Sequence, residues 1–279
     1  MIDVSVIVVN FNTFDYTKDC INSIFKFTKR CSFEVILVDN NSSEIVPMEF
    51  EELFPNIKVI HLSENFGFSK ANNFGIGFAN GNTILLLNSD TELLNDAISI
   101  CFDRIKNDKK IGVVGPYLVN TDGSFQVSSK CFPTIWKEIV IILKLYRVFP
   151  LYNYNVEFGR IQPVHEFSTD YVIGAFFMFR KDDLSHFSDN KLHEDFFMYI
   201  EDIQWCYYFK NNLRKTIVFL PQAKVLHHGS ASSSIEFNNS KFYNIILPNI
   251  YHLVFLTKGS VYLSLYKALV RIRFYLSGF

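Results

Sequence analysis

The chain has 279 residues, a formal net charge of −1 at pH 7, 49% hydrophobic residues and 20% charged residues. This length allows one large α/β domain or two small ones with ample core, and the composition argues against disorder. The near-neutral charge argues against nucleic-acid binding driven by counterion release, so we expect no nucleic-acid partner.

Cysteine usage and the N-terminal segment favour a cytoplasmic protein. The five cysteines are widely spaced and form no C-x-x-C motif, which argues against a disulfide framework or a zinc site. Residues 1–12 lack the basic region and cleavage site of a signal peptide, and their apolar run predicts a first strand. No run of 18 apolar residues occurs, so no helix is expected to span a bilayer.

Strand and helix patterns alternate over the first 115 residues. Apolar runs predict strands at 4–9, 34–38, 57–61, 84–87 and from 111. Helical spacing predicts helices at 15–27, with Thr13 as a possible cap, and at 44–54, 69–79 and 93–106. Such alternation predicts an α/β fold with a mainly parallel sheet and helices on both faces.

The later part of the chain is less regular. Helices are predicted at 133–145 and 201–212, and strands at 170–180, 216–220 and 223–226. No linker separates the halves, so residues 1–235 are expected to form one domain and residues 236–279 a tail.

The tail combines basic and apolar residues. Residues 241–279 contain five lysines and arginines and no acid, and Pro248 and Gly259 are expected to break the segment into helical pieces. Amphipathic helices of this composition are typical of the membrane interface, so a peripheral membrane contact is expected. The alternative is a helical hairpin that packs on the domain with its basic residues in solvent.

Two predicted strands end on acids. Asn88-Ser89-Asp90 follows the strand at 84–87, and Asp39 follows the strand at 34–38. Ligands of open α/β sheets bind beyond the carboxyl ends of the strands, where a carboxylate can hold Mg²⁺ beside substrate phosphates. The alternative for Asp90 is a cap on the following helix.

Three further segments carry polar groups suited to the same chemistry. Gly67 permits a tight turn before a helix whose N-terminus could face a pyrophosphate. Glu201 and Asp202 open a helix, where acids also occur simply to complement the helix dipole. His227 and His228 end a strand and can supply a metal ligand.

Eight segments in this order together resemble the family 2 glycosyltransferases of the GT-A fold, especially their rhamnosyltransferase-like branch. The resemblance covers roughly residues 3–257 and implies a GT-A-type, Rossmann-like domain. It is carried by V-S-V-I-V-V-N-F-N (4–12), V-D-N-N-S (38–42), E-N-F-G-F-S-K-A-N-N (64–73), L-L-L-N-S-D-T-E (85–92), F-P-T-I-W (132–136), V-I-G-A-F-F-M-F-R (172–180), F-F-M-Y-I-E-D (196–202) and H-H-G-S-A-S (227–232).

The resemblance implies a donor side and a metal. Asp39 would bind the nucleotide base with Asn10 nearby, Asn88 would lie near the ribose, and Asp90 would bind Mg²⁺ or Mn²⁺ between the two donor phosphates. The other donor-side positions that it implies are Asn65, Gly67 and Asn73.

The resemblance also implies an acceptor side. Asp202 would be the general base, and Gly174, Ala175 and Glu201 would lie near the acceptor. His227 would be a second metal-side ligand, although the neighbouring His228 could take that place.

Two residues depart from the family pattern. Asn88 stands where the family's D-x-D motif begins with an acid, which leaves one carboxylate for the metal. Gln204 stands where the family often has an acid, which puts contacts beside the acceptor in doubt.

The implied activity is an inverting, metal-dependent hexosyl transfer. The donor would be a nucleotide sugar, dTDP-rhamnose or a UDP-sugar, and the acceptor a saccharide, lipid-linked, in surface polysaccharide synthesis at the inner face of the cell membrane. One base and one metal suffice for a single in-line displacement, which inverts the anomeric carbon.

Two alternatives stay open. The chain could be a non-catalytic nucleotide-sugar-binding module. It could also be a sugar nucleotidyltransferase, although no glycine-rich basic loop follows the first strand.

Overall fold

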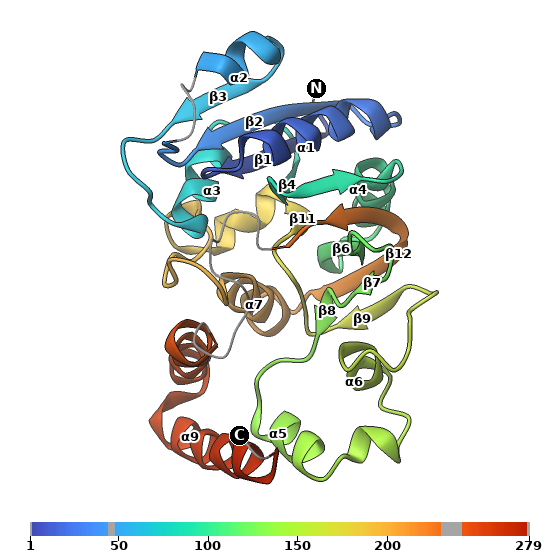
Figure 1. Ribbon diagram of the computed structural model, residues 1–279, viewed down its shortest axis with the longest axis vertical. Helices are drawn as coiled ribbons and strands as arrows, with labels where there is room; N and C mark the ends of the chain where they lie inside the picture. Colours follow the sequence, from blue (N-terminus) through green and yellow to red (C-terminus); the bar gives the residue numbers. More distant parts are fainter. Residues whose placement is uncertain (1, 44–47, 230–241, 278–279) are drawn as a thin grey trace.

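A ten-stranded sheet organises the computed structural model, which describes residues 2–43, 48–229 and 242–277. The main strand order is β3-β2-β1-β4-β11-β6-β12-β5, with β7 paired to β6 and β9 paired to β12 (Figure 1). The strands are β1 (Val4–Asn10), β2 (Phe33–Asp39), β3 (Lys58–His61), β4 (Thr83–Asn88), β5 (Thr91–Leu93), β6 (Ile111–Val119), β7 (Phe125–Gln126), β9 (Phe167–Thr169), β11 (Phe176–Arg180) and β12 (Thr216–His227), with β8 (Ser129–Lys130) and β10 (Tyr171–Val172) as a separate pair.

Most strands of this sheet run the same way. β1 pairs in parallel with β2 and β4, β2 with β3, and β6 with β12, whereas β11 is antiparallel to both β4 and β6. The predicted mainly parallel α/β fold is confirmed. The carboxyl ends of six strands therefore meet the start of β11 at one edge of the sheet.

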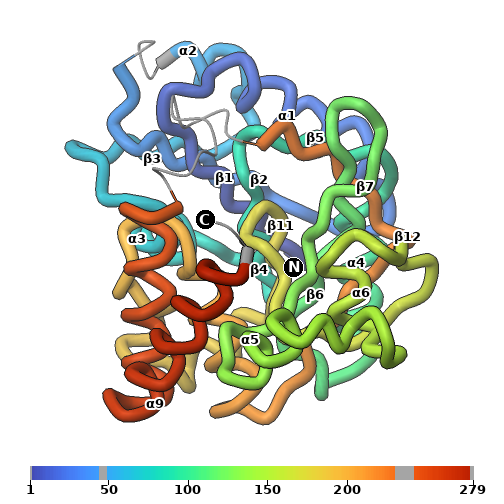
Figure 2. Tube along the Cα trace, turned by 60° about the horizontal axis from the view of Figure 1, so that its bottom comes forward, coloured from blue at the N-terminus to red at the C-terminus, as the bar shows by residue number. Residues whose placement is uncertain are grey.

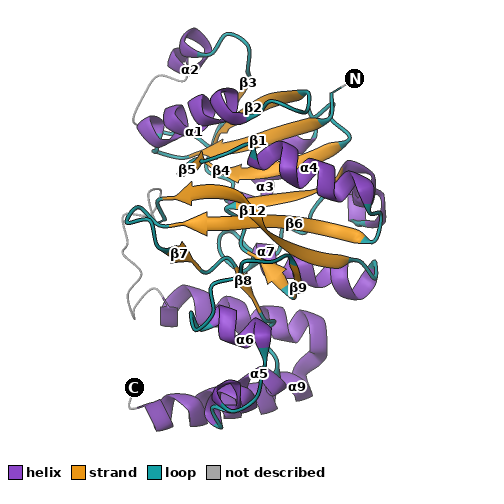
Figure 3. Ribbon diagram, turned by 90° about the vertical axis from the view of Figure 1, so that its right-hand side faces the viewer, coloured by secondary structure: helices purple, strands orange, loops and turns teal. Residues whose placement is uncertain are grey.

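Helices cover both faces of the sheet (Figures 1 and 3). α1 (Phe14–Phe27) and α4 (Ala97–Asn107) pack on one face, and α3 (Phe68–Ile76) and α7 (Glu201–Tyr207) on the other. Along β1, Val6 and Val8 face the first layer and Ile7 faces the second, as the two-residue period of a strand requires. Both faces of the central strands are buried, which explains their uninterrupted apolar runs.

Shorter helical elements fill the connections. They are α2 (Met48–Leu53), α5 (Ile135–Ile142), η1 (Leu145–Arg147), α6 (Tyr152–Glu157), η2 (Lys181–His186), η3 (Ser188–Asn190), η4 (Tyr208–Asn212) and η5 (Phe242–Ile246). The start of the predicted helix at 44–54 and the domain boundary at 235 lie outside the described residues.

Tertiary pairing changes three of the predicted elements. Residues 91–93 form β5 against the end of β12, so the helix predicted from residue 93 begins at Ala97. The predicted strands at 216–220 and 223–226 are one strand, β12, with an irregularity between Leu220 and Lys224. The strand predicted at 170–180 is interrupted between β10 and β11, where Gly174 turns towards α7.

The C-terminal segment packs on the domain as a bent helix. α9 (Leu247–Ser277) is interrupted at Gly259, where φ is 82°, and its two legs fold back beside α5 (Figure 2). Contrary to expectation, Phe242–Leu276 is long and apolar enough to cross a membrane, judged by length and composition alone. Requiring an unbroken apolar run missed this stretch because scattered polar residues interrupt it.

Candidate active site

The ends of β1 and β2 bring Asn10 and Asp39 side by side. These two residues are register partners, and Asn10 Nδ2 donates to Asp39 Oδ1 at 2.8 Å and to Ser42 Oγ at 3.0 Å. The Ser42 amide donates to Asp39 Oδ2 at 3.2 Å. The buried Asp39 carboxylate is therefore held in one orientation at the edge of the sheet.

A hydroxyl network joins this pair to the tip of β4. Asn10 Oδ1 accepts from the hydroxyls of Thr13 and Thr17, each at 2.9 Å, and Thr13 Oγ1 shares a hydrogen bond of 2.9 Å with Ser89 Oγ. Thr13 does precede α1, but its side chain makes no cap bond there. Its hydroxyl instead links the tips of β1 and β4, and Asn10 extends the network to Asp39 on β2.

Asp90 and His227 meet because β5 pairs with the end of β12. Thr91 and His227 are register partners, which places His227 Nε2 at 3.3 Å from the buried Asp90 Oδ1. His228 turns the other way, with its Nε2 at 2.9 Å from Glu92 Oε1. Of the two histidines that the sequence left open, His227 is the one beside Asp90.

Gln126, on β7, orients the His227 ring. Gln126 Nε2 donates to Asn120 Oδ1 at 2.8 Å, so its Oε1 is the atom that faces His227 Nδ1 at 2.6 Å. A carbonyl oxygen can only accept, so Nδ1 donates this hydrogen bond and Nε2 is the ring nitrogen that faces Asp90. The sequence analysis missed Gln126, whose only signal was its position just after T-D-G-S (121–124), a segment of turn-forming residues.

These residues fit a divalent cation that also has substrate ligands. Asp90 offers a carboxylate and His227 a ring nitrogen, a donor set suited to Mn²⁺ and tolerable for Mg²⁺. Among residues 2–43, 48–229 and 242–277, no group of three or more His, Cys, Asp or Glu side chains is placed to hold a metal. The remaining ligands would have to be phosphate oxygens and water, which is the usual arrangement for Mg²⁺.

Asp202 lies in the first turn of α7 and is held by two backbone amides. Its Oδ2 accepts from Gly174 N at 2.9 Å and its Oδ1 from Ile203 N at 2.8 Å. Burial raises the pKa of Asp202, while these amide bonds and the charge of Lys130 act against the rise. A carboxylate with a raised pKa is a stronger proton acceptor near neutral pH.

Glu201 precedes Asp202 and is buried in the domain. Burial, followed by repulsion from Asp202, raises the pKa of Glu201 to about 8, so this side chain is mainly neutral at pH 7. Among the described residues, its Oε2 has no hydrogen-bond partner. Burial raises the pKa of both carboxyl groups, and their repulsion makes it unfavourable for both to be ionised at once.

Gly174 and Ala175 connect the two halves of the candidate site. Gly174 N donates to Asp202, and Ala175 O accepts from Asn88 N at 3.0 Å. This two-residue segment thus lies between the candidate base and the tip of β4. The structure brings Asp39, Asp90 and Asp202 to one edge of the sheet through a continuous set of contacts.

The remaining donor-side candidates have structural contacts. Asn65 Oδ1 accepts from Asn40 Nδ2 at 2.8 Å, which ties the 64–67 loop to the tip of β2. A Cβ at Gly67 would lie 2.4 Å from Phe197 O, so only glycine allows this loop to approach the segment before α7. Asn73 bonds both backbone groups of Leu192, which fixes the same segment from α3.

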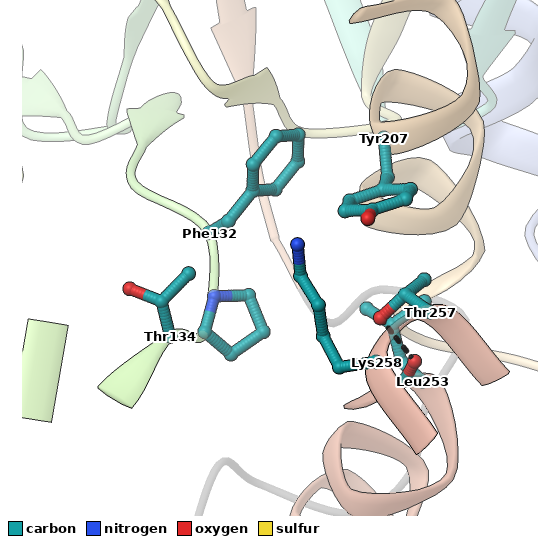
Figure 4. A pocket seen from close by; sticks show the side chains of 7 residues that line it. Phe132, Thr134, Tyr207, Leu253, Thr257 and Lys258 are labelled. Atoms are coloured by element: carbon teal, nitrogen blue, oxygen red, sulfur yellow. Dashed lines mark hydrogen bonds between the residues drawn. The ribbon is translucent and has the colours of Figure 1, made fainter. Parts of the chain in front are cut away.

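A small apolar pocket lies at a different place, between the segment before α5 and the first leg of α9 (Figure 4). The Lys258 ammonium lies 5.3 Å from the centroid of the Tyr207 ring. The residues that line the pocket are Phe132, Pro133, Thr134, Tyr207, Leu253, Thr257 and Lys258. None of the candidate site residues lines this pocket.

Comparison with known proteins identifies similar chains. Residues 5–187 match the model of the family described as glycosyl transferase family 2. The N-acetylglucosaminyl-diphospho-decaprenol L-rhamnosyltransferase of Mycobacterium tuberculosis is 23% identical over 215 residues, which cover 71% of this chain and 67% of that protein.

Solved structures share the fold at low identity. S. aureus TarS 1–349 is 17% identical with a TM-score of 0.57, and the match covers 98% of this chain and 72% of that one. The same protein in complex with UDP is 18% identical with a TM-score of 0.57, and that match covers 91% of this chain and 65% of the other. GalNAc-T7, crystallised with UDP, GalNAc and Mn²⁺, is 15% identical with a TM-score of 0.59 over 82% of this chain. This chain spans 44% of that last structure.

Proposed function

The chain belongs to glycosyl transferase family 2, and on that basis we propose that it moves a sugar from a nucleoside-diphosphate donor to a saccharide acceptor with inversion at the anomeric carbon. The observation that carries this proposal is the convergence of three groups at one edge of the sheet. They are the oriented carboxylate of Asp39, the Asp90–His227 pair, and the amide-held carboxylate of Asp202.

The donor side would use residues at the strand tips. Asp39, oriented by Asn10 and Ser42, offers a fixed acceptor for the N–H of a pyrimidine base. Asp90 and His227 would hold Mg²⁺ or Mn²⁺, which when bound neutralises the charge that develops on the diphosphate leaving group. Gln126 would keep His227 in the tautomer that this role requires.

The acceptor side would use Asp202 as the general base. Its carboxylate takes the proton of the acceptor hydroxyl while the acceptor oxygen bonds to the anomeric carbon and the bond to the diphosphate oxygen breaks. The amides of Gly174 and Ile203 keep the carboxylate in place for this transfer. One displacement with one base inverts the anomeric centre and needs no second nucleophilic carboxylate.

The relatives support a choice of substrates. The mycobacterial relative is named as an L-rhamnosyltransferase that acts on a diphospho-decaprenol, and two structural neighbours were solved with UDP. We therefore propose a dTDP-rhamnose or UDP-sugar donor and a lipid-linked saccharide acceptor in polysaccharide synthesis. Transfer would take place at the cytoplasmic face of the cell membrane, where such acceptors are elongated.

The test is a transfer assay on the purified chain and its Asp202→Asn variant, with a panel of nucleotide sugars and Mn²⁺. We expect the variant to lose at least about 100-fold in turnover, the typical contribution of a general base. Donor binding, measured as the thermal shift that a native-state ligand produces, should remain. A chelator should abolish transfer by the wild type.

The matched control is Asp189→Asn, which replaces an exposed acid at φ 55°, a conformation that asparagine tolerates. Its turnover should equal that of the wild type. Equal turnover of Asp202→Asn and the wild type would refute the assigned base. If the variant and wild type both bind donors but neither transfers sugar to any acceptor, the non-catalytic binding module is the correct alternative.

A further inference from the structure

The second leg of α9, residues 260–277, carries apolar side chains on two opposite faces. Tyr266 and Val270 are buried and form the inner face. The outer positions follow the spacing i, i+4, i+7, i+11 and i+14 along one stripe, and all are exposed: Val261, Leu265, Ala268, Ile272 and Tyr275. The four large residues of this stripe are 47–85% exposed.

Contacts with α5 fix the rotation of this helix. Tyr262 Oη accepts from Ile135 N at 2.8 Å, and Tyr266 Oη donates to Glu138 Oε1 at 3.2 Å. Arg273 Nε lies 3.3 Å from Glu138 Oε2. Because these bonds hold the inner face against the domain, the outer stripe stays directed away from α5.

The charges beside the stripe all have one sign. Residues 242–277 contain no acid, and Lys267 and Arg271 lie one helical turn apart on one flank of the stripe. Arg273, on the other flank, pairs with Glu138. We name Val261, Leu265, Ala268, Ile272 and Tyr275, together with Lys267 and Arg271, the outer α9 face.

The outer α9 face belongs to one end of the molecule. α5 and the second leg of α9 lie together at the end opposite to α2 and β3 (Figures 1 and 3). Trp136 and Leu143 of the neighbouring α5 segment are also exposed there, beside Lys144. Apolar and basic groups are therefore concentrated at this end.

The geometry favours a helix that lies in the membrane interface and does not cross the bilayer. A spanning helix needs about 20 consecutive apolar residues, and Gly259 divides α9 before that length is reached. The second leg also contains Lys267, Arg271 and Arg273; Arg273 pairs with Glu138 of the domain, and the Lys267 ammonium lies 5.0 Å from the centroid of the Tyr251 ring in the first leg. Helices of this kind bury one apolar face at the headgroup boundary and place their cations against anionic lipids.

We propose that the outer α9 face binds the surface of a bilayer that contains anionic lipids, with the second leg parallel to the membrane plane. The proposal rests on the proposed function in one respect, because a lipid-linked acceptor requires the enzyme at such a surface. A second copy of the chain fits less well, since a twofold contact would set the same basic flank against itself.

The test is co-sedimentation of the full chain with vesicles of phosphatidylcholine alone and of phosphatidylcholine with phosphatidylglycerol. The wild type should bind the anionic vesicles, and binding should weaken with salt. The double variant Leu265→Glu with Ile272→Glu should reduce partitioning of the protein onto the vesicles at least about ten-fold, because two large apolar side chains can no longer be buried in the bilayer surface. Lys267→Gln and Arg271→Gln should each reduce it about five-fold.

Leu53→Glu is the matched control, because Leu53 is 51% exposed but lies at the end of α2, far from the outer α9 face. It should bind vesicles as the wild type does. Transfer to a short soluble acceptor, measured on every variant, should be unchanged, which separates membrane binding from the proposed function. If the wild type ignores anionic vesicles, or if Leu265→Glu with Ile272→Glu abolishes self-association and not vesicle binding, the proposal is overturned.

Discussion

Two consecutive residues before the acid pair, Tyr199 and Ile200, have left-handed backbone conformations with φ 67° and 79°. A β-branched residue such as Ile200 is rare there, and each such conformation costs on the order of 1–3 kcal/mol. Asn249 of α9 donates its side-chain amide to Met198 O at 3.2 Å and to Tyr199 O at 3.4 Å, which holds the turn. This backbone sets Glu201 and Asp202 at the start of α7, with Glu201 buried and Asp202 partly buried.

The charge state of Glu201 predicts a pH dependence of stability. Burial raises the pKa of Glu201 to about 8 from its ordinary value of 4.5, so the folded state binds this proton more tightly than the unfolded chain. Between these two values the unfolded chain binds fewer protons, so the free energy of unfolding falls as the pH rises. In the wild type the free energy of unfolding should fall by on the order of a few kcal/mol across that window, and Glu201→Gln should abolish this part of the fall.

Urea unfolding at a series of pH values measures this effect. Glu64→Gln, at an exposed glutamate, is the control and should leave the slope unchanged. The pKa of Asp202 is also raised, so Asp202 contributes in the same direction. The slope of unfolding free energy against pH should therefore be smaller in Glu201→Gln than in the wild type, but not zero. Parallel curves for Glu201→Gln and the wild type would show that Glu201 is ionised in the folded protein.

At the scale of elements, the close packing of α3 on β1 positions the loops around the site. A Cβ at Gly75 would lie 2.5 Å from Ile7 Cγ2 and 3.1 Å from Val38 Cγ2. Through Asn73, the same helix holds the segment that leads to α7. The distance between α3 and the sheet therefore affects both the donor-side loop and the candidate base.

Gly75→Ala should lower the free energy of unfolding by about 1–3 kcal/mol, the usual effect of overpacking, despite the better helix propensity of alanine. Gly77→Ala is the matched control on the same helix end, because its nearest contact would be Phe74 O at 3.3 Å and its φ of −59° suits any residue. Chemical denaturation compares the two. An unfolding free energy of Gly75→Ala at or above that of the control would show that α3 can move away from the sheet.

At the scale of the whole molecule, Glu138 connects the C-terminal segment to the domain. Its carboxylate is buried, burial raises its pKa, and it pairs with Tyr266 and Arg273 of α9. Lys137 on the same helix pairs instead with Glu157 at 2.6 Å. α5 is thus the element through which α9 is held on the rest of the chain.

Glu138→Ala should loosen the second leg without unfolding the sheet. Removing the partner of the buried Tyr266 hydroxyl and of the partly buried Arg273 costs about 1–3 kcal/mol, which corresponds to roughly five- to hundred-fold faster amide exchange in residues 260–277. Hydrogen exchange read by mass spectrometry should show no change in β4. Tyr275→Ala, on the outer α9 face, serves as control, and equal exchange in both variants would show that Glu138 does not hold the helix.

The sequence by itself determined the sheet core, since apolar runs with the period of a strand must be buried wherever they pair. It also predicted that Asp39 and Asp90 would follow the carboxyl ends of strands in a mainly parallel sheet, where ligands bind. That expectation needed no knowledge of which strands are neighbours.

Only the tertiary structure decided which side chains meet at that edge. The pairing of β5 with β12 turns His227 to Asp90 and His228 to Glu92, because adjacent residues of a strand point to opposite sides. The β6–β7 hairpin brings Gln126 to His227. The Thr13 hydroxyl bonds Ser89 and does not cap α1. Such contacts join residues distant in the chain, and local propensity does not encode which partners they find.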